Sequence, residues 1–571
     1  MKINNLLHIS RLDKNYNEDK KYEEEIFFGP WCISSREYLE STCDLFIDYD
    51  AVLIEENIHF GLLEADKLVD NCIKYLGNYL NKYHGVGYSK LFWRTILVNW
   101  LTHIIHSIHF YYNQLLKLNE QISSKYVVIT DSRINYNRLS DPMTNDSQEM
   151  NEYIHGLISL IVEEADFSKI KFEKKSIITP VVKKETTSKS FLSKIFWFVL
   201  KNKTSRYLSY NNFTLSNIEK LLMKFKYKDF SFSYKEVIEC KKEMVVLDFY
   251  LGDSVIERII SKFINRFSPA SLTHCFKRYL FNSKDYIGRH SIVGSYGVYQ
   301  DEQLFEIALA RENGSKFILM EEGANGAPKY NAEENYSYKI SDFYLSFGWT
   351  KVGYEDRIIS AASPRLSRFY NRHEEKNDKI LYLSGIRMNF SMYSSYLTHS
   401  SKYVKNKVSF IFEIINAGFN DKMIVKPHQT VQYTSLNNDD EIKDIFNLPY
   451  THSFERQVWL SNCAIFYVDY LSTSIFEGFM YNVPTIICLD KDLVIVDDEL
   501  IKHFEIFKKL GIFFDNPVAA AQRILSIYDN RVSFWNRKNI QVARQNFLND
   551  WAKHHDNWLD TIINIIRRLD D

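Results

Sequence analysis

The chain has 571 residues, too many for one hydrophobic core, so we expect two domains, or two domains with an insertion. Hydrophobic residues make up 45% and charged residues 25% of the chain, the proportions of a soluble globular protein. The formal net charge of −1 excludes a global field that would attract nucleic acid, and no apolar run approaches the roughly 20 residues that span a bilayer.

Seven scattered cysteines without a Cys-x-x-Cys pair predict a reduced, cytoplasmic location and exclude a disulfide framework or a zinc site. The first residues lack the apolar core and small-residue cleavage site of a signal peptide. His103, His106 and His109 recur on one helix face, but no acidic or cysteine partner stands at helical spacing. We therefore interpret them as packing histidines and expect no metal.

The first quarter of the chain mixes strand and helix patterns. Residues 25–31 and 125–131 resemble strands, and apolar residues recur at helical spacing from Leu62 to about Gln121. We expect helical insertions at about 60–121 and 135–240 within a first domain of residues 1–370.

A basic segment interrupted by aromatic residues runs from Lys183 to Arg206. Such a segment can lie in an anionic membrane interface, which would make the protein a peripheral membrane protein. A surface helix with one face on the core is the other interpretation.

Strand and helix patterns then alternate along the rest of the chain. Strand-like runs occur at residues 244–250, 290–297, 316–323, 342–349, 379–384, 423–425, 464–468, 485–489 and 511–515. This alternation predicts an α/β fold with parallel sheets, arranged as two Rossmann-like domains that face a cleft. We place the second domain at residues 371–535 and expect closing helices, residues 536–571, to pack back on the first domain.

Polar motifs follow several of these strands, at the edge where α/β sheets bind ligands. In the second domain, Ser472, Thr473 and Ser474 precede a helical run, with Glu477 completing a capping box for Ser474. The free N–H groups of that helix start can also bind a phosphate, and Glu477 could reach sugar hydroxyls. A simple helix cap explains the same residues equally well.

Two further motifs border the same predicted crevice. One is Lys426-Pro427-His428, whose lysine and histidine can donate to a phosphate. The other is Ser384-Gly385-Ile386-Arg387, in which the glycine permits close backbone approach and Arg387 can pair with a phosphate. Neither Gly-x-x-x-x-Gly-Lys-Ser/Thr nor Gly-x-Gly-x-x-Gly occurs, which argues against a kinase, ATPase or dehydrogenase.

In the first domain, Glu321 and Glu322 end a strand and lead into a turn that contains Asn325. Two adjacent acids facing a cleft suit a general base, because burial and mutual repulsion raise one pKa; a solvated acidic turn is the plainer interpretation. His290 and Ser295, on the preceding strand, are expected to line the acceptor side of the same cleft.

Together these motifs, with Phe28-Gly-Pro-Trp31 and residues 340–349, resemble transferases of bacterial surface-polysaccharide gene clusters. More distantly the chain is similar to GT-B glycosyltransferases that use CMP-activated keto-sugars, such as sialyltransferases and Kdo transferases. Two departures stand out. The Pro427-His428 order reverses the His-Pro of those enzymes, and Glu321-Glu322-Gly-Ala stands where relatives carry Gln-His-Gly-Gly.

The resemblance implies transfer of a nonulosonic acid or Kdo-type sugar from a CMP donor to a surface glycan such as O-antigen or capsule. It implies Glu321 or Glu322 as the base. It implies His428 as a catalytic residue that donates a hydrogen bond to the CMP phosphate, and Thr473 with Ser474 as further contacts of that phosphate. It also implies no cofactor beyond the CMP-sugar, a lipid-linked or growing glycan as acceptor, and work at the inner face of the cytoplasmic membrane. The alternatives are a CDP-polyol phosphotransferase of the teichoic-acid type and a non-catalytic nucleotide- or glycan-binding protein.

Overall fold

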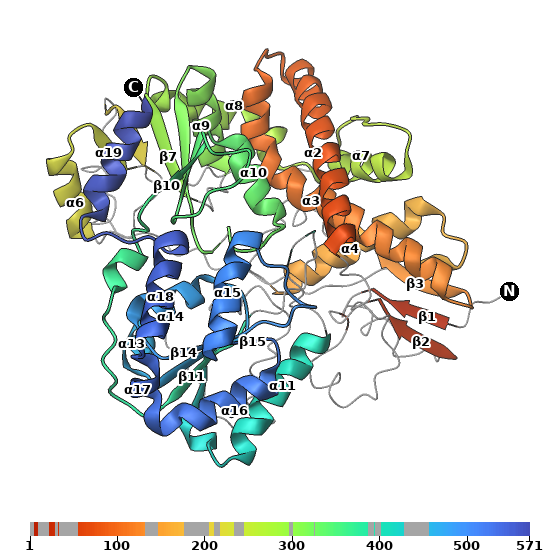
Figure 1. Cartoon of the computed structure of the whole chain (residues 1–571). Helices are drawn as coiled ribbons and strands as arrows, with labels where there is room; N and C mark the ends of the chain where they lie inside the picture. Colours follow the sequence, from red (N-terminus) through yellow and green to blue (C-terminus); the bar gives the residue numbers. More distant parts are fainter. Residues whose placement is uncertain are drawn as a thin grey trace.

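A computed structural model describes residues 5–9, 22–28, 32, 55–131, 147–175, 205–209, 217–232, 245–295, 301–324, 326–385, 393, 395, 401–426 and 456–570. Within these ranges the chain forms three sheets, and every strand pairing in them is parallel (Figure 1). The expected α/β class is confirmed.

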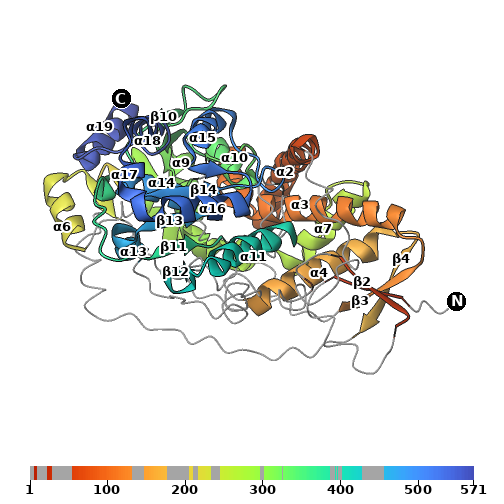
Figure 2. The same ribbon diagram turned by 60° about the horizontal axis from the view of Figure 1, so that its bottom comes forward.

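The first sheet has four strands in the order β2-β1-β3-β4. They are β1 (Asn5–His8), β2 (Glu24–Phe27), β3 (Tyr126–Asp131) and β4 (Ile170–Lys175). The helices of this part are α2 (Glu55–His84), α3 (Lys90–Gln121) and α4 (Ser147–Ala165). Helix α3 is buried around most of its circumference because it packs between α2 and α4 and also contacts α9 (Figure 2).

The second sheet has six strands in the order β10-β9-β8-β7-β5-β6. They are β5 (Tyr207–Ser209), β6 (Phe230–Phe232), β7 (Ser291–Ser295), β8 (Lys316–Met320), β9 (Phe343–Ser346) and β10 (Ile358–Ser360). The helices between these strands in the chain are α6 (Asn217–Lys226), α7 (Val255–Phe267), α8 (Phe276–Asn282), α9 (Asp301–Glu312) and α10 (Ala332–Ile340); α7 packs on α3 and α4.

The third sheet has five strands in the order β12-β11-β13-β14-β15. They are β11 (Ile380–Leu383), β12 (Met423–Lys426), β13 (Ile465–Val468), β14 (Thr485–Cys488) and β15 (Phe513–Phe514). Its helices are α11 (Ser401–Asn416), α13 (Arg456–Asn462), α14 (Thr473–Tyr481), α15 (Asp498–Leu510), α16 (Pro517–Ile527), α17 (Arg531–Trp535) and α18 (Lys538–Trp551).

Strands β11, β12, β13 and β14 are buried at every position, as their continuous apolar runs require. The chain crosses from β12, on one side of β11, to β13 on its other side, so the strand order reverses between β11 and β13. Open α/β sheets bind ligands beside such a switch point, at the carboxyl ends of the strands.

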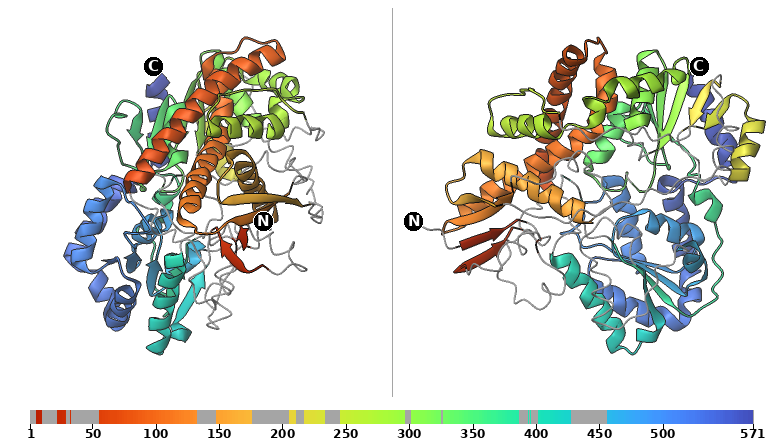
Figure 3. Two further views of the ribbon diagram at one scale, coloured as in Figure 1. Left: turned by 90° about the vertical axis from the view of Figure 1, so that its right-hand side faces the viewer. Right: turned by 180° about the vertical axis from the view of Figure 1, so that it is seen from behind.

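The last helix, α19 (Trp558–Asp570), returns to the six-stranded sheet, whereas α18 stays on the third sheet against α14 and α15 (Figure 3). Trp558, Ile562, Ile563 and Ile566 share an apolar cluster with side chains of β5, β6, β7, β8 and β9. The predicted closing helices therefore divide between the two larger sheets.

Two expectations about the first half differ from the structure. The described residues within 135–240 form the helices α4 and α6 but also supply β4, β5 and β6 to two sheets, so the described part of this region is only partly helical. Residues 245–250 form no strand; Leu247 N–H donates instead to the carbonyl of Asn265 on α7. None of the described helices is both long and apolar enough to cross a bilayer.

Candidate functional site

The two predicted acids after β8 have opposite environments. Glu321 is 3% exposed, and its Oε2 accepts hydrogen bonds from the Phe347 amide at 2.6 Å and from the Trp349 indole at 2.8 Å. The buried carboxylate thus ties the turn after β8 to the turn after β9. The prediction of Glu321 as a base is corrected, because this side chain is withdrawn from solvent and occupied by structural donors.

Glu322 points out of the same turn and is exposed to solvent. The surrounding protein still excludes enough water to raise the pKa of its carboxyl above the usual value. An accessible carboxylate with a raised pKa is suited to accept a proton from a hydroxyl group.

The turn that follows the acids passes directly beneath Trp349. A Cβ on Gly326 would lie 2.2 Å from Cε2 of that indole, so only glycine fits here. Trp349 in turn stacks on Trp551 at the end of α18. The acid turn is therefore packed against Trp349, in the turn after β9, and through it against Trp551 of α18.

In the second half, the switch point between β11 and β13 is filled by a polar network around Asp469. This carboxylate accepts from the Tyr382 hydroxyl at 2.5 Å, the Tyr403 hydroxyl at 3.1 Å and the Gly385 amide at 3.2 Å. A Cβ on Gly385 would lie 2.2 Å from the Tyr403 hydroxyl oxygen, so the predicted close backbone approach is made to this network.

Two lysines lie beside this network. Lys407 on α11 donates from Nζ to Ser384 Oγ at 2.5 Å and to the Gly385 carbonyl at 2.9 Å. Lys426 ends β12 and is 2% exposed, and burial lowers the pKa of its ammonium group. Ser384, Gly385 and Lys426 are thus brought together, and the backbone N–H of Ser384 donates to the Lys426 carbonyl.

The start of α14 adjoins Asp469 in the chain. Its N-cap is Ser472, whose side chain accepts from the Ser474 amide at 3.2 Å. Ser472 and Thr473 are partly exposed, so the helix start can receive an anion. The predicted cap at Ser474 is corrected by two residues, and that serine is buried within the first turn.

Glu477 lies one turn further along α14 and is 1% exposed. Its Oε1 pairs with the Arg365 guanidinium at 2.8 Å. The prediction of a sugar contact is corrected, because this carboxylate faces Arg365 on the connection between the two halves.

His290 also departs from its predicted place. It precedes β7 at the amino edge of the sheet, whereas Glu322 follows β8 at the carboxyl edge. Its Nδ1 lies 3.3 Å from Oδ2 of Asp570 at the end of α19. His290 therefore belongs to the docking site of α19 and lies on the wrong edge of the sheet for an acceptor contact.

The remaining predicted positions have no described side chain. Arg387, Pro427, His428 and Asn325 lie outside the described residues, as does most of segment 183–206. Ser295 ends β7, and only its backbone is described. Their assignments stay predictions.

A small recess opens next to the network, at the carboxyl ends of β13 and β14. Its lining includes Tyr403, Asn406, Asp469, Tyr470 and Asp490. Asp490 accepts from Asn406 at 2.9 Å and pairs with Lys402 at 2.9 Å. Sequence reasoning missed Asp469 and Asp490, although each is the first or second residue after a predicted strand; nothing in the sequence indicated Lys407 or Tyr403.

The chain segments that leave the two carboxyl edges pair with each other. Pro328, six residues after Glu322, pairs with Val496 in an antiparallel bridge, and Val496 follows the recess residue Asp490 by six positions. Across the described ranges, no group of three or more His, Cys, Asp and Glu side chains is arranged to hold a metal ion.

Fold and site together define an α/β protein whose polar groups gather at the carboxyl edges of two parallel sheets. A family model described as "LIC12162 family transferase" matches residues 6–566. The chain therefore belongs to this family and is a transferase. Among curated proteins, none matches the chain.

Solved structures resemble the chain at low identity. They include Acinetobacter baumannii MurG, with 9% identity, coverage of 78% of this chain and 99% of that chain, and a TM-score of 0.32. Arabidopsis thaliana UGT89C1 complexed with UDP has 10% identity, coverage of 81% of this chain and 96% of that chain, and a TM-score of 0.31. A Thermobaculum terrenum O-GlcNAc transferase mutant has 8% identity, coverage of 65% of this chain and 68% of that chain, and a TM-score of 0.32. Because all three TM-scores are below 0.5, the fold class here follows from the chain's own sheet topology.

Proposed function

We propose that this transferase is a glycosyltransferase of the GT-B type that moves a keto-sugar from a CMP-activated donor to a glycan acceptor. The observation that carries the proposal is the exposed carboxylate of Glu322, with its raised pKa, at the carboxyl edge of one parallel sheet. The chain that leaves this edge pairs, at Pro328, with the chain that leaves the carboxyl edge of a second sheet, at Val496, and the switch point of that second sheet presents a helix start. The CMP donor and the keto-sugar follow from the sequence resemblance.

In the proposed reaction, the bond between the anomeric carbon and the donor phosphate oxygen breaks, and its electron pair leaves with CMP. The acceptor hydroxyl oxygen forms the new bond to the anomeric carbon and gives its proton to Glu322. Ser472, Thr473 and the free N–H groups at the start of α14 stabilise the negative charge on the departing phosphate. His428 is proposed as a further donor to that phosphate.

Asp469 and the groups that donate to it hold the backbone at the switch point in place. Three groups donate hydrogen bonds to this carboxylate. They hold the backbone at Gly385, in the proposed phosphate-contacting motif that begins at Ser384. We assign Asp469 a positioning role and propose a lipid-linked or growing surface glycan as the acceptor.

The test is thermal unfolding of the whole chain with CMP, CDP, UDP and GDP, repeated with His428→Ala. A ligand at about 100 times its dissociation constant stabilises the folded state by roughly 2.7 kcal/mol. Stabilisation by CMP alone that disappears in the variant supports the proposal. A preference for UDP or GDP overturns the donor assignment, a preference for CDP favours polyol-phosphate transfer, and no response favours a non-catalytic binding protein.

A further inference from the structure

Three chain segments, one that follows a strand of the six-stranded sheet and two that follow strands of the five-stranded sheet, meet in one set of hydrogen bonds. The Lys329 amide donates to the Ile495 carbonyl at 3.1 Å, and the Ile495 amide donates to the Ser395 carbonyl at 3.0 Å. The Ser395 amide donates to the Tyr330 carbonyl at 2.8 Å, and the Tyr330 amide returns a bond to Ser395 Oγ at 2.7 Å. We call residues 327–330, Ser395 and residues 495–498 the clasp.

Each clasp segment comes from a part of the candidate site. Residues 327–330 continue from the acid turn of Glu322, and residues 495–498 continue from Asp490 in the wall of the recess. Ser395 lies between Gly385 and α11, so it belongs to the connection that follows the switch-point residue Gly385. The clasp therefore joins the proposed base to the proposed donor side through short stretches of chain.

Side chains reinforce the clasp on its first-half side. Lys329 Nζ lies 2.8 Å from Oε1 of Glu55, at the start of α2, and 2.9 Å from Oδ1 of Asp498, at the start of α15. The Tyr330 hydroxyl donates to the same Glu55 oxygen at 3.0 Å. One lysine thus bridges carboxylates from the two halves.

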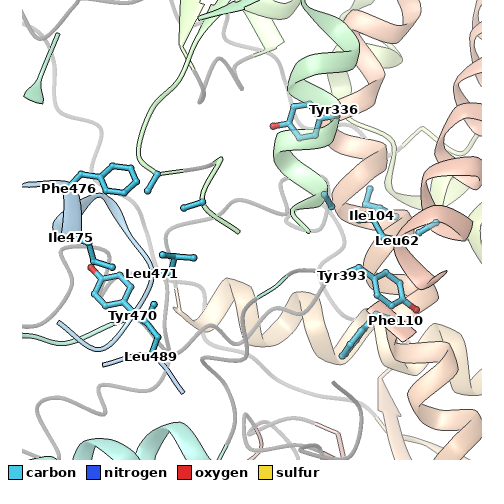
Figure 4. Packing of buried hydrophobic residues seen from close by; sticks show 14 of the residues in the cluster. Leu62, Ile104, Phe110, Tyr336, Tyr393, Tyr470, Leu471, Ile475, Phe476 and Leu489 are labelled. Atoms are coloured by element: carbon cyan, nitrogen blue, oxygen red, sulfur yellow. The ribbon is translucent and has the colours of Figure 1, made fainter. Parts of the chain in front are cut away.

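Two positions before Ser395, Tyr393 anchors the same connection in the helical layer. Its hydroxyl lies 2.8 Å from His109 Nδ1, and its ring packs beside Phe110, Leu62 and Ile104 (Figure 4). The ring lies so close to α2 that a Cβ on Gly61 would be 2.2 Å from Tyr393 Cε1. Tyr393 is 8% exposed and Ser395 is 1% exposed, so neither anchor is solvated.

We propose that Ser395 is a positioning residue and that the clasp stays formed through the reaction, so that Glu322 and the donor side keep one fixed separation. The catalytic consequence rests on the proposed glycosyltransferase function. The physical basis is the buried serine itself, whose amide, carbonyl and hydroxyl oxygen are all used. Opening the halves at this point would leave those groups without partners in an unsolvated place.

The first test compares Ser395→Ala with Ser395→Thr, which keeps the hydroxyl oxygen for the Tyr330 amide. With CMP-N-acetylneuraminic acid as donor, we expect Ser395→Ala to lower kcat between about 10- and 100-fold, because small misplacements of reacting groups cost this much. The dissociation constant for CMP stays within about twofold, and Ser395→Thr recovers kcat. Ser283→Ala is the matched control, since Ser283 is also 1% exposed and donates one side-chain bond, to the Tyr279 carbonyl, outside the clasp. Equal kcat in Ser395→Ala and Ser283→Ala overturns the positioning role.

The second test locks the clasp. Pro328 and Val496 oppose each other in the antiparallel bridge, between the Lys329–Ile495 and Asp497–Ala327 hydrogen bonds. Such pairs have Cα atoms about 4.5 Å apart, within the range of a disulfide. We expect the oxidised Pro328→Cys/Val496→Cys variant, with the linked peptide identified by mass spectrometry, to keep kcat within twofold of its reduced form. Loss of activity on oxidation that a reductant reverses overturns the proposal.

A third readout separates this inference from the proposed function. Hydrogen exchange of the Lys329 and Ile495 amides reports the clasp directly, with or without any turnover. We expect both amides to exchange at the slow rate of the central strands, with CMP present or absent. Exchange as fast as that of exposed loops overturns the clasp even if sugar transfer is observed. Slow exchange in a chain that turns over no CMP-sugar supports the clasp and overturns the proposed transfer from a CMP-sugar.

Discussion

The carboxyl edges of the two larger sheets are built from the same kind of strand but are finished differently. At the edge of the six-stranded sheet, one acid is buried against Phe347 and Trp349 while its neighbour Glu322 stays exposed. At the edge of the five-stranded sheet, Asp469 is surrounded by three donors from β11, α11 and the Gly385 turn.

The difference separates two tasks. The second edge satisfies its polar groups internally, which fixes the backbone that leads to the start of α14. The first edge satisfies one carboxylate in the same way and leaves the other without a structural duty in its turn. The proposed base, Glu322, and the carboxylate that ties its turn, Glu321, therefore occupy consecutive positions in the sequence.

Glu322→Gln removes the proposed base and has the largest expected effect. We expect transfer to fall by at least about 100-fold, the usual contribution of a general base, with CMP binding unchanged. Because the surrounding protein desolvates Glu322 in part and raises its pKa, the contribution of this group to stability is lost as pH rises through its folded pKa. The variant should therefore unfold no earlier than the parent at pH 7. Product formation and a thermal melt measure both effects, and a normal rate in Glu322→Gln would transfer the base to another residue.

Glu321→Ala breaks the structural side of this comparison. The Phe347 amide and the Trp349 indole lose their shared acceptor in a buried place, so we expect the free energy of unfolding to fall by roughly 2–4 kcal/mol. Urea denaturation at pH 7 measures the change. The matched control is Glu322→Ala, the neighbouring glutamate; if it destabilises as much as Glu321→Ala, the division of tasks between the two acids is wrong.

Gly61→Ala tests the anchor that Tyr393 makes in the helical layer. The added methyl group would overlap the tyrosine ring, and overpacking of this kind costs about 1–3 kcal/mol despite the better helix propensity of alanine. A double-mutant cycle with Tyr393→Leu measures the coupling by urea denaturation. Additive effects would show that the ring does not occupy this place in solution.

The smallest expected effect is a pH dependence from the buried histidines of α3. Burial, with a further contribution from His106, lowers the pKa of His103 to about 3. Below about pH 6.5, His103 is protonated in the unfolded chain but stays neutral in the folded chain. The contribution of His103 to the free energy of unfolding is therefore lost as pH falls from about 6.5 towards 3. At pH 6 the loss is roughly 1 kcal/mol. His103→Gln should flatten the urea midpoint against pH between pH 7 and 5, and an unchanged slope would contradict the assignment.

Sequence patterns predicted the elements whose side chains are buried on both faces. Residues 316–323 and 464–468 read as strands because a parallel sheet demands continuous apolar runs, and β8 and β13 stand there. Residues 245–250 misled for a physical reason. Leu247 and Phe249 are buried while Val246 and Tyr250 are exposed, which is the alternation of a strand, but Asn265 on α7 takes the hydrogen bonds that a neighbouring strand would supply.

The site was predictable only in outline. Polar residues after a strand can be read from the sequence, which placed Glu321, Glu322, Ser384 and Lys426 at the correct edges. Which glutamate is buried depends on Phe347 and Trp349, which come 25 or more positions later, and no local pattern carries that information. Lys407 reaches Ser384 from the second turn of α11, another contact that spacing alone does not indicate.

The return of α19 to the six-stranded sheet has a consequence for the order of synthesis. Strands β5 to β9 leave the ribosome more than two hundred residues before Trp558, Ile562 and Ile566, which cover their apolar face. The first half of a nascent chain therefore carries an uncovered apolar surface while the second half is being made. The apolar packing of the six-stranded sheet is therefore complete only after α19 has been made.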